Sequence, residues 1–173
     1  MNPSDARTVE VQLGRPPRGR WGVLTRCAAG APTLIAVEPR LEDGTPFPTY
    51  FWLTCPLAAS LLHELETAGI QARWSELALV DEGLAEKFRR AAAEYRRVRA
   101  ESVADGVDPC AGGIAGERDP LRVKCLHARV AAAMGGIDDP VGRALLPEIE
   151  GAMARCDRAC CVTPGDEDAV SSV

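Results

Sequence analysis

The apolar residues of this sequence change their spacing at Cys55, and this change limits the folds that the chain can adopt. Before Cys55, three short runs rich in β-branched and aromatic residues are typical of strands. They span Trp21–Cys27, Thr33–Val37 and Thr49–Cys55. Only a short turn-forming segment separates the first two runs, so we predict a small N-terminal antiparallel sheet of about three strands.

After Cys55 the apolar residues recur every three or four positions, as they do in amphipathic helices. Pro56 suits a first helical turn, and Gly69 ends the apolar face that follows it. A short helix is predicted around Trp74–Val80, and two Asp-Pro pairs predict starts for helices over 121–134 and 140–153. The sequence therefore predicts an α+β fold, in which about five helices pack on the small sheet.

The clearest helical stripe lies in the middle of the chain. Its apolar members are Leu84, Phe88, Ala91, Tyr95 and Val98. The other side of this helix carries basic residues that we expect to be solvated. They are Lys87, Arg89, Arg90, Arg96, Arg97 and Arg99.

The chain has 173 residues, which is about the length of one domain. We predict an extended basic N-terminal segment over residues 1–20, because Gly14–Arg20 is rich in Pro, Gly and Arg. Residues 21–162 are predicted to form a single α+β domain. Residues 163–173 are acidic and small, and we expect a disordered tail there.

Charge and hydropathy favour a cytoplasmic protein. The formal net charge of −5 argues against general nucleic-acid binding, which normally requires a basic excess. The first residues include no apolar run, and no stretch approaches the roughly 20 apolar residues of a membrane span. The seven cysteines are therefore expected to be reduced, as thiols usually are in the cytosol.

Three cysteines and one histidine form the ligand set of a tetrahedral zinc site, namely Cys27, Cys55, Cys125 and His127. Zinc is the cofactor that this set would bind, although the spacing lacks the paired knuckles of zinc fingers. In a regular helix over 121–134, Cys125 and His127 would point about 200° apart. One metal can bind both only if that helix begins later. The alternatives are a buried thiol beside a hydrogen-bonded histidine, and a catalytic thiol.

The remaining cysteines lie outside this set. Cys156 and Cys160 are four residues apart, so on a helix they could share a metal or oxidise together. Cys161 adjoins them near the acidic tail, and we expect this group to be exposed to solvent. Cys110 lies in a Gly-rich segment that is predicted to be a long loop.

Five basic residues are candidates for binding an anion or a partner: Arg15, Arg18, Arg40, Arg122 and Lys124. Arg122 and Lys124 fall in the first turns of the helix predicted to start at Asp119. Cations are disfavoured there unless an anion compensates them. Pairing with Glu42, Asp43 or Asp119 would explain the same residues without a ligand.

Four separated motifs resemble an actinobacterial family of unknown function, the one numbered 501. They are Leu13–Gly19, Pro39–Thr49, Trp52–Pro56 and Arg122–Ala128, in order within residues 11–150. The resemblance implies a cytoplasmic protein. Members are often encoded beside a septum-formation initiator protein and an exopolyphosphatase, which implies a link to cell division or polyphosphate. This chain departs from the family pattern at Ala28, Ala29 and Ala132, where relatives often carry additional potential ligands.

No complete catalytic constellation is present, so the sequence favours a non-catalytic binding or regulatory protein over an enzyme. Its partner would be a protein or an anionic small molecule that meets the basic residues. One alternative is an enzyme acting on a phosphorylated or polyphosphate substrate, with Cys125 or a metal as the reactive group. The other is a zinc-stabilised structural module. The sequence leaves the oligomeric state open.

Overall fold

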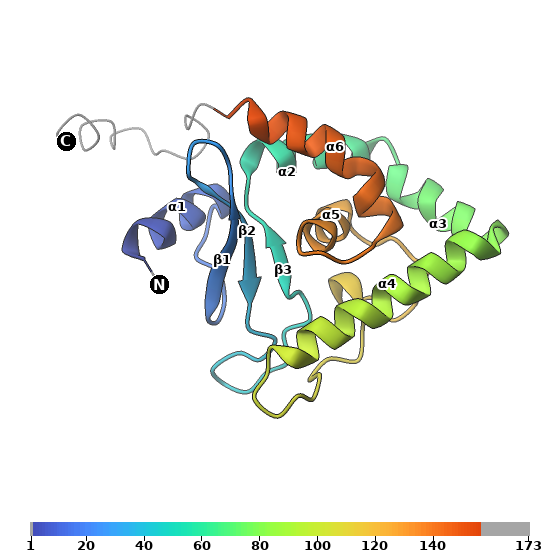
Figure 1. The fold of residues 1–173 in the computed structure, drawn as a ribbon, viewed down its shortest axis with the longest axis horizontal. Coiled ribbons are helices and arrows are strands. Elements are labelled where there is room, and N and C mark those ends of the chain that lie inside the picture. Colours follow the sequence, from blue (N-terminus) through green and yellow to red (C-terminus); the bar gives the residue numbers. More distant parts are fainter. Residues whose placement is uncertain (1, 157–173) are drawn as a thin grey trace.

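A computed structural model describes residues 2–156 of the chain, and Figure 1 shows the arrangement of its elements. The strands are β1 (Trp21–Arg26), β2 (Pro32–Val37) and β3 (Phe51–Leu53). The helices are α1 (Pro3–Leu13), α2 (Pro56–Thr67), α3 (Ile70–Val80), α4 (Glu82–Glu101), α5 (Leu126–Met134) and α6 (Pro140–Ala154), with a short 3₁₀ turn η1 (Ile114–Gly116). This is the predicted α+β fold, with six helices in the described part of the chain where about five were expected.

The three strands form one antiparallel sheet in the order β1-β2-β3. Leu34 of β2 pairs with Leu53 of β3, and Trp21 of β1 pairs with Val37 of β2. The predicted sheet is therefore confirmed, although β3 is shorter than the run from which it was predicted. Successive residues of β2 contribute to different cores, because side chains alternate between the two faces of a sheet.

The main core lies between one face of the sheet and helices α2 to α6 (Figure 1). Leu34 and Phe51 on this face are in the same core as Phe88 and Tyr95 of α4. Phe88 and Tyr95 are fully buried, as the apolar stripe predicts. The Tyr95 hydroxyl accepts the N–H of Tyr50 at 2.8 Å, which joins α4 to the start of β3. The sheet and the longest helix are thus held together by both apolar and polar contacts.

A helix, α1, covers the other face of the sheet, where an extended segment was predicted. The prediction of an extended segment is wrong for residues 3–13. It relied on the Pro-, Gly- and Arg-rich run Gly14–Arg20, which begins only after α1 ends. Asn2 caps α1 by accepting the N–H of Ser4, and Gly14 ends it with a left-handed backbone at φ 68°. Val9 of α1 is fully buried in a second core that includes Ile35 of β2.

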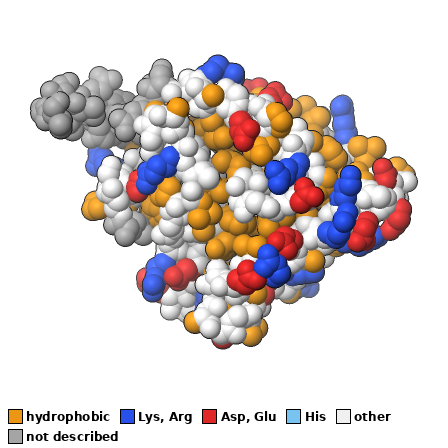
Figure 2. Space-filling model, in the orientation of Figure 1, with side chains coloured by type: hydrophobic (Ala, Val, Ile, Leu, Met, Phe, Trp, Pro, Cys, Tyr) orange, Lys and Arg blue, Asp and Glu red, His pale blue; other side chains and the backbone are white. Residues whose placement is uncertain are grey.

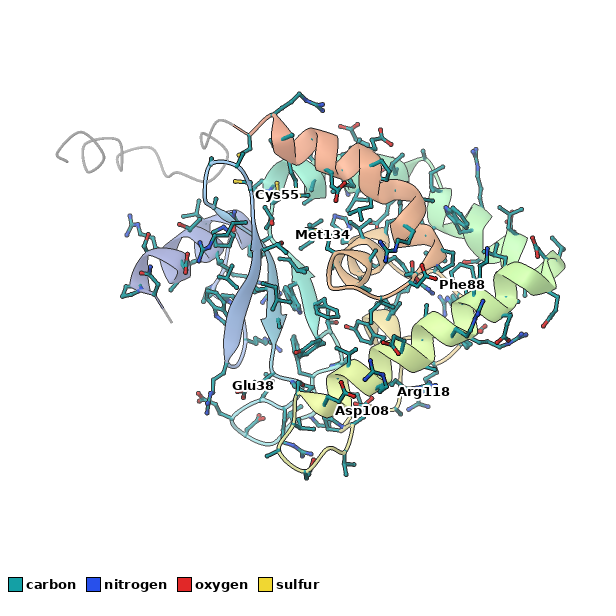
Figure 3. The ribbon with its side chains drawn as sticks, viewed as in Figure 1. Glu38, Cys55, Phe88, Asp108, Arg118 and Met134 are labelled. Atoms are coloured by element: carbon teal, nitrogen blue, oxygen red, sulfur yellow. The ribbon has the colours of Figure 1, made fainter. Side chains whose placement is uncertain are left out.

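Arg99 does not lie on the solvated face of α4, as was predicted, but is completely buried. Its Nε and Nη2 donate to the two oxygens of Asp108, at 2.8 and 2.7 Å. Its guanidinium also donates to the carbonyls of Pro48, Cys110 and Gly112. Figure 3 shows Asp108 beside the C-terminal end of α4. Arg99 therefore fastens the long 102–118 loop to the body of the domain.

The rest of the basic face of α4 is solvated as predicted, and acidic residues accompany it. Arg89 pairs with Glu82, and Arg97 pairs with Glu94 and Glu101. Basic and acidic side chains alternate over α4 in the space-filling view (Figure 2). Within the described residues, none of the helices has the length and apolar content that crossing a bilayer requires.

Candidate metal centre

One group of side chains in residues 2–156 brings three potential metal donors together. Glu66, Cys125 and His127 each offer one donor atom, and these atoms lie within 4.8 Å of one another. The Cys125 sulfur is 3.8 Å from Nδ1 of His127, and this Nδ1 is 3.2 Å from Oε1 of Glu66. The three side chains therefore supply one sulfur, one nitrogen and one oxygen around a common point.

Cys125 and His127 approach each other because α5 begins at Leu126, and not near Leu121 as predicted. Cys125 is the N-cap of α5 and has an extended backbone, with φ −154° and ψ 124°. It is therefore outside the regular helix, so the angular separation of residues two apart in a helix does not apply to this pair. Cys125 and His127 could share one metal only if their helix began later than predicted, and α5 does so.

Glu66 lies in the last turn of α2 and reaches across to the start of α5. Its Oε1 accepts the N–H of Leu126 at 2.6 Å, in addition to its contact with His127. A carboxylate is favourable at this position, because the first amides of a helix have no intrahelical partner and carry partial positive charge. Sequence reasoning missed Glu66. Its spacing offered a signal, because it is four residues after the buried Leu62 and so lies near the buried side of α2, whereas Glu64 is exposed.

The His127 ring is fixed on both sides. Its Nε2 is 3.1 Å from the carbonyl oxygen of Ala59 in α2, so this nitrogen carries a proton and donates it. Both Cys125 and Glu66 face the other nitrogen, Nδ1. The hydrogen bond with Cys125, followed by the one with Glu66, raises the pKa of His127 to about 9, against the opposing effect of burial.

Cys27 and Cys55 are not part of this group, although the sequence suggested a shared site with Cys125. Cys55 is the N-cap of α2, at the start of that helix in Figure 3. It is 1% exposed and occupies the main core as a small apolar side chain. Cys27 follows β1 and lines a surface groove with Met134 and Met153. The structure thus brings together two of the four predicted ligands.

The five predicted basic residues lie in different surroundings. Arg15 is exposed and its guanidinium lies 5.3 Å above the ring of Trp52. Arg18, Arg40 and Lys124 are exposed, and Arg122 lies 3.6 Å from a carboxylate oxygen of Glu117. Arg122 and Lys124 precede α5 and so are not within its first turn, contrary to the prediction.

The predicted acidic partners have other roles. Asp43 accepts the N–H of Thr45, and hydrogen bonds from Thr45 lower the pKa of that carboxyl group. Asp119 accepts the N–H of Leu121. Intramolecular pairing therefore accounts for Arg122 among the five basic residues, through a partner, Glu117, that the sequence analysis did not name.

The other cysteines do not join the metal group. Cys110 is half-buried in the loop that Arg99 holds, and burial raises the pKa of its thiol. Cys156 is half-buried after the end of α6. Cys160, Cys161 and the predicted acidic tail at 163–173 lie outside the described residues.

A family model described as "Protein of unknown function (DUF501)" matches residues 23–147. The chain belongs to this family. The match covers more than half of the chain, excludes α1, and includes Glu66, Cys125 and His127. No curated protein and no solved structure matches the chain. DUF501 membership therefore supplies no activity, and function must be argued from the site.

Proposed function

We propose that this DUF501 chain is a zinc-binding domain whose protein ligands are Glu66, Cys125 and His127. The convergence of their three donor atoms carries the proposal. In a tetrahedral zinc site, ordinary bond lengths place nitrogen and oxygen donors about 3.3 Å apart, and nitrogen and sulfur donors about 3.5 Å apart. The separations here are 3.2 Å and 3.8 Å. These two separations differ from the tetrahedral values by about 0.1 Å and about 0.3 Å.

The orientation of the His127 ring favours a metal ligand over a catalytic triad. In a triad, the acid holds one ring nitrogen and the nucleophile faces the other. Here both Cys125 and Glu66 face Nδ1, while Nε2 donates to the carbonyl of Ala59. Metal-binding histidines typically show this second arrangement, because a backbone carbonyl fixes the tautomer and leaves the other nitrogen free for the metal.

The choice of zinc follows from the chemistry of the donors. A thiolate sulfur and an imidazole nitrogen suit zinc, whereas magnesium and calcium prefer oxygen ligands. The bound ion would join the last turn of α2 to the first turn of α5. Zinc at about 100 times its dissociation constant would add about 2.7 kcal/mol to the unfolding free energy. For a chain of this size that is about 5–10 °C in Tm.

The test is the zinc content and zinc affinity of the purified protein. We expect elemental analysis of protein purified without chelator to give one zinc per chain. The Cys125→Ser variant should lower the zinc affinity by more than about 100-fold, since loss of a supporting residue alone costs 10–100-fold. Serine is a preferred N-cap residue, so this variant should keep α5 and the fold of the metal-free protein.

Matched variants on the same helix give the control. Glu66→Gln should weaken zinc binding strongly, whereas Glu64→Gln should leave it unchanged because Glu64 is exposed and outside the group. Cys27→Ser should also leave it unchanged. The proposal is wrong if the wild-type chain does not take up zinc, or if Cys125→Ser binds it as tightly as the wild type.

A second candidate function is the binding of an anionic partner through Arg15, Arg18 and Arg40. The observation that favours it is that these exposed guanidinium groups make no ion pair within residues 2–156. An Arg15→Ala, Arg40→Ala double variant should lose proteins or anions that the wild-type chain retains from cell extract. Arg122→Ala is the control, because Arg122 already has Glu117. Identical sets of bound molecules in all three would exclude this function.

A further inference from the structure

The metal centre has three donors from the protein, and zinc is normally bound by four. Within residues 2–156, no further Cys, His, Asp or Glu joins the group of Glu66, Cys125 and His127. Structural zinc sites are closed by four protein ligands, whereas three protein ligands leave a position for a water or an external molecule. The donor count therefore points to a centre that accepts a ligand from solution.

The position of the centre at the surface allows such a ligand to enter. The side chains of His127 and Glu66 are 30% and 23% exposed, and Cys125 is half-buried. A buried centre would exclude solvent, and its fourth ligand would have to come from the fold. A partly exposed centre can exchange a bound water for a molecule of similar size.

The start of α5 adds a preference for negative charge. No side chain caps α5. The Leu126 N–H is taken by Glu66, but the next two amides, of His127 and Ala128, make no hydrogen bond outside the helix within the described residues. These amides lie in the first turn of α5, directly after its N-cap Cys125, and free amides at a helix start favour anions. A divalent ion with one thiolate, one carboxylate and one neutral imidazole has no net charge, so it does not repel an anion.

We propose that the zinc of this centre binds a small oxyanion from solution, through a phosphate or carboxylate oxygen. The oxygen bound to zinc takes the fourth coordination position. A second oxygen of the same group accepts the free N–H groups at the start of α5. This inference rests on the proposed zinc site, and it goes beyond that site in assigning an external ligand and its chemical class.

The experiment uses the full-length protein loaded with Co²⁺, which takes the coordination of zinc and is coloured. Binding of Co²⁺ is measured first from its visible absorption. Inorganic phosphate and acetate are then titrated separately at constant ionic strength, with sodium chloride as the balancing salt. We expect at least one of them to change the Co²⁺ bands in a saturable way. Which one does so identifies the source of the oxygen.

The two proposals fail in distinguishable ways. If no Co²⁺ or Zn²⁺ binds, the zinc site itself is wrong. If Co²⁺ binds but neither phosphate nor acetate changes its bands beyond the chloride control, the zinc site stands and the oxyanion proposal is overturned.

The contribution of the helix amides is tested with Ala128→Pro, which removes one N–H within the first turn, where proline is tolerated. We expect unchanged Co²⁺ affinity and oxyanion binding that is weaker by at least about tenfold, since the variant loses a hydrogen bond to a charged group. Equal oxyanion affinity in the variant and the wild type would refute the role of the amides.

If Ala128→Pro does not fold, ³¹P relaxation of phosphate with the wild-type protein tests directly whether phosphate binds at the metal. Strong relaxation by the Co²⁺ form, relative to the Zn²⁺ form, shows phosphate bound at the metal. Equal relaxation in the two forms excludes it.

Discussion

Replacement of the buried Arg99 by methionine should cost this domain much of its stability. Methionine has a similar length and is apolar, so the substitution removes the guanidinium while keeping most of the packing. The guanidinium is completely buried and holds both oxygens of Asp108. It also donates to the carbonyls of Pro48 and Gly112, which belong to different loops. With the carbonyl of Cys110, five acceptor atoms would therefore each lose a hydrogen bond at once.

The size of the effect follows from what remains behind. Removal of one member of a buried ion pair costs about 3–5 kcal/mol, because the other charge stays buried without its partner. The Asp108 side chain keeps 15% of its exposure, so water can reach the carboxylate. We therefore expect a loss near the lower end, about 3 kcal/mol. Domains unfold with about 5–15 kcal/mol, so this loss is a large fraction of the total.

Arg97 provides a matched control two residues away on the same helix. It also pairs with two carboxylates, Glu94 and Glu101, but its side chain is 55% exposed. Exposed helix pairs contribute about 0.3–0.5 kcal/mol each, so Arg97→Met should cost less than about 1 kcal/mol. Urea unfolding followed by circular dichroism measures both values. If Arg99→Met and Arg97→Met are destabilised equally, the argument from burial is wrong.

Three further predictions concern other parts of the domain. Burial raises the pKa of Tyr95 from 10.0 to about 12. The stability that comes from keeping Tyr95 neutral is therefore complete below pH 10 and is lost as the pH rises towards 12. Between pH 10 and pH 12, the unfolding free energy measured in urea should fall by about 2–3 kcal/mol less for Tyr95→Phe than for the wild type. Gly142→Ala should destabilise by about 1–3 kcal/mol, because its Cβ would lie 2.3 Å from a backbone oxygen of α5. Gly151→Ala, in the same helix, should raise Tm, because its Cβ would make only an ordinary contact, 3.8 Å from Nη1 of Arg155, and alanine is favoured over glycine by about 0.5–1 kcal/mol. Ser75→Ala should lower the zinc affinity about tenfold with the fold intact, because Ser75 holds the segment before Cys125; unchanged affinity by Co²⁺ competition would contradict this.

Residue type was sufficient to predict the sheet, and periodicity was sufficient to predict most of the helices. β2 forms where a run rich in β-branched residues predicted a strand, and Phe88 and Tyr95 are buried as their spacing indicates. These features depend on which side of an element is apolar, and a local pattern records that directly. The predicted zinc ligands Cys125 and His127 also lie together. Their residue types identified them, since a thiol and an imidazole are rare enough in this chain to be noticed.

The errors have a different physical origin, namely polar groups that tertiary contacts bury. Arg99 is four residues after the buried Tyr95, so its spacing places it on the buried side of α4, unlike Arg97, but its charge led to the prediction of a solvated position. Its burial depends on Asp108 in a distant part of the loop. In the same way, the apolar side of α1 is buried only because Ile35 and its neighbours make the second face of the sheet apolar. Partners of this kind are determined by the fold as a whole.

The metal centre shows why the start of a helix can decide a site. A helix continued upstream of Leu126 would need its backbone groups for internal hydrogen bonds. Those groups are already used, because Ser75 accepts the N–H of Val123 and the guanidinium of Arg129 donates to the carbonyls of Pro120 and Arg122. These contacts keep the backbone of Cys125 extended, and its sulfur therefore faces the imidazole of His127. The site is therefore a consequence of competition between helical and tertiary hydrogen bonds, and weakening the tertiary ones should weaken metal binding without touching a ligand.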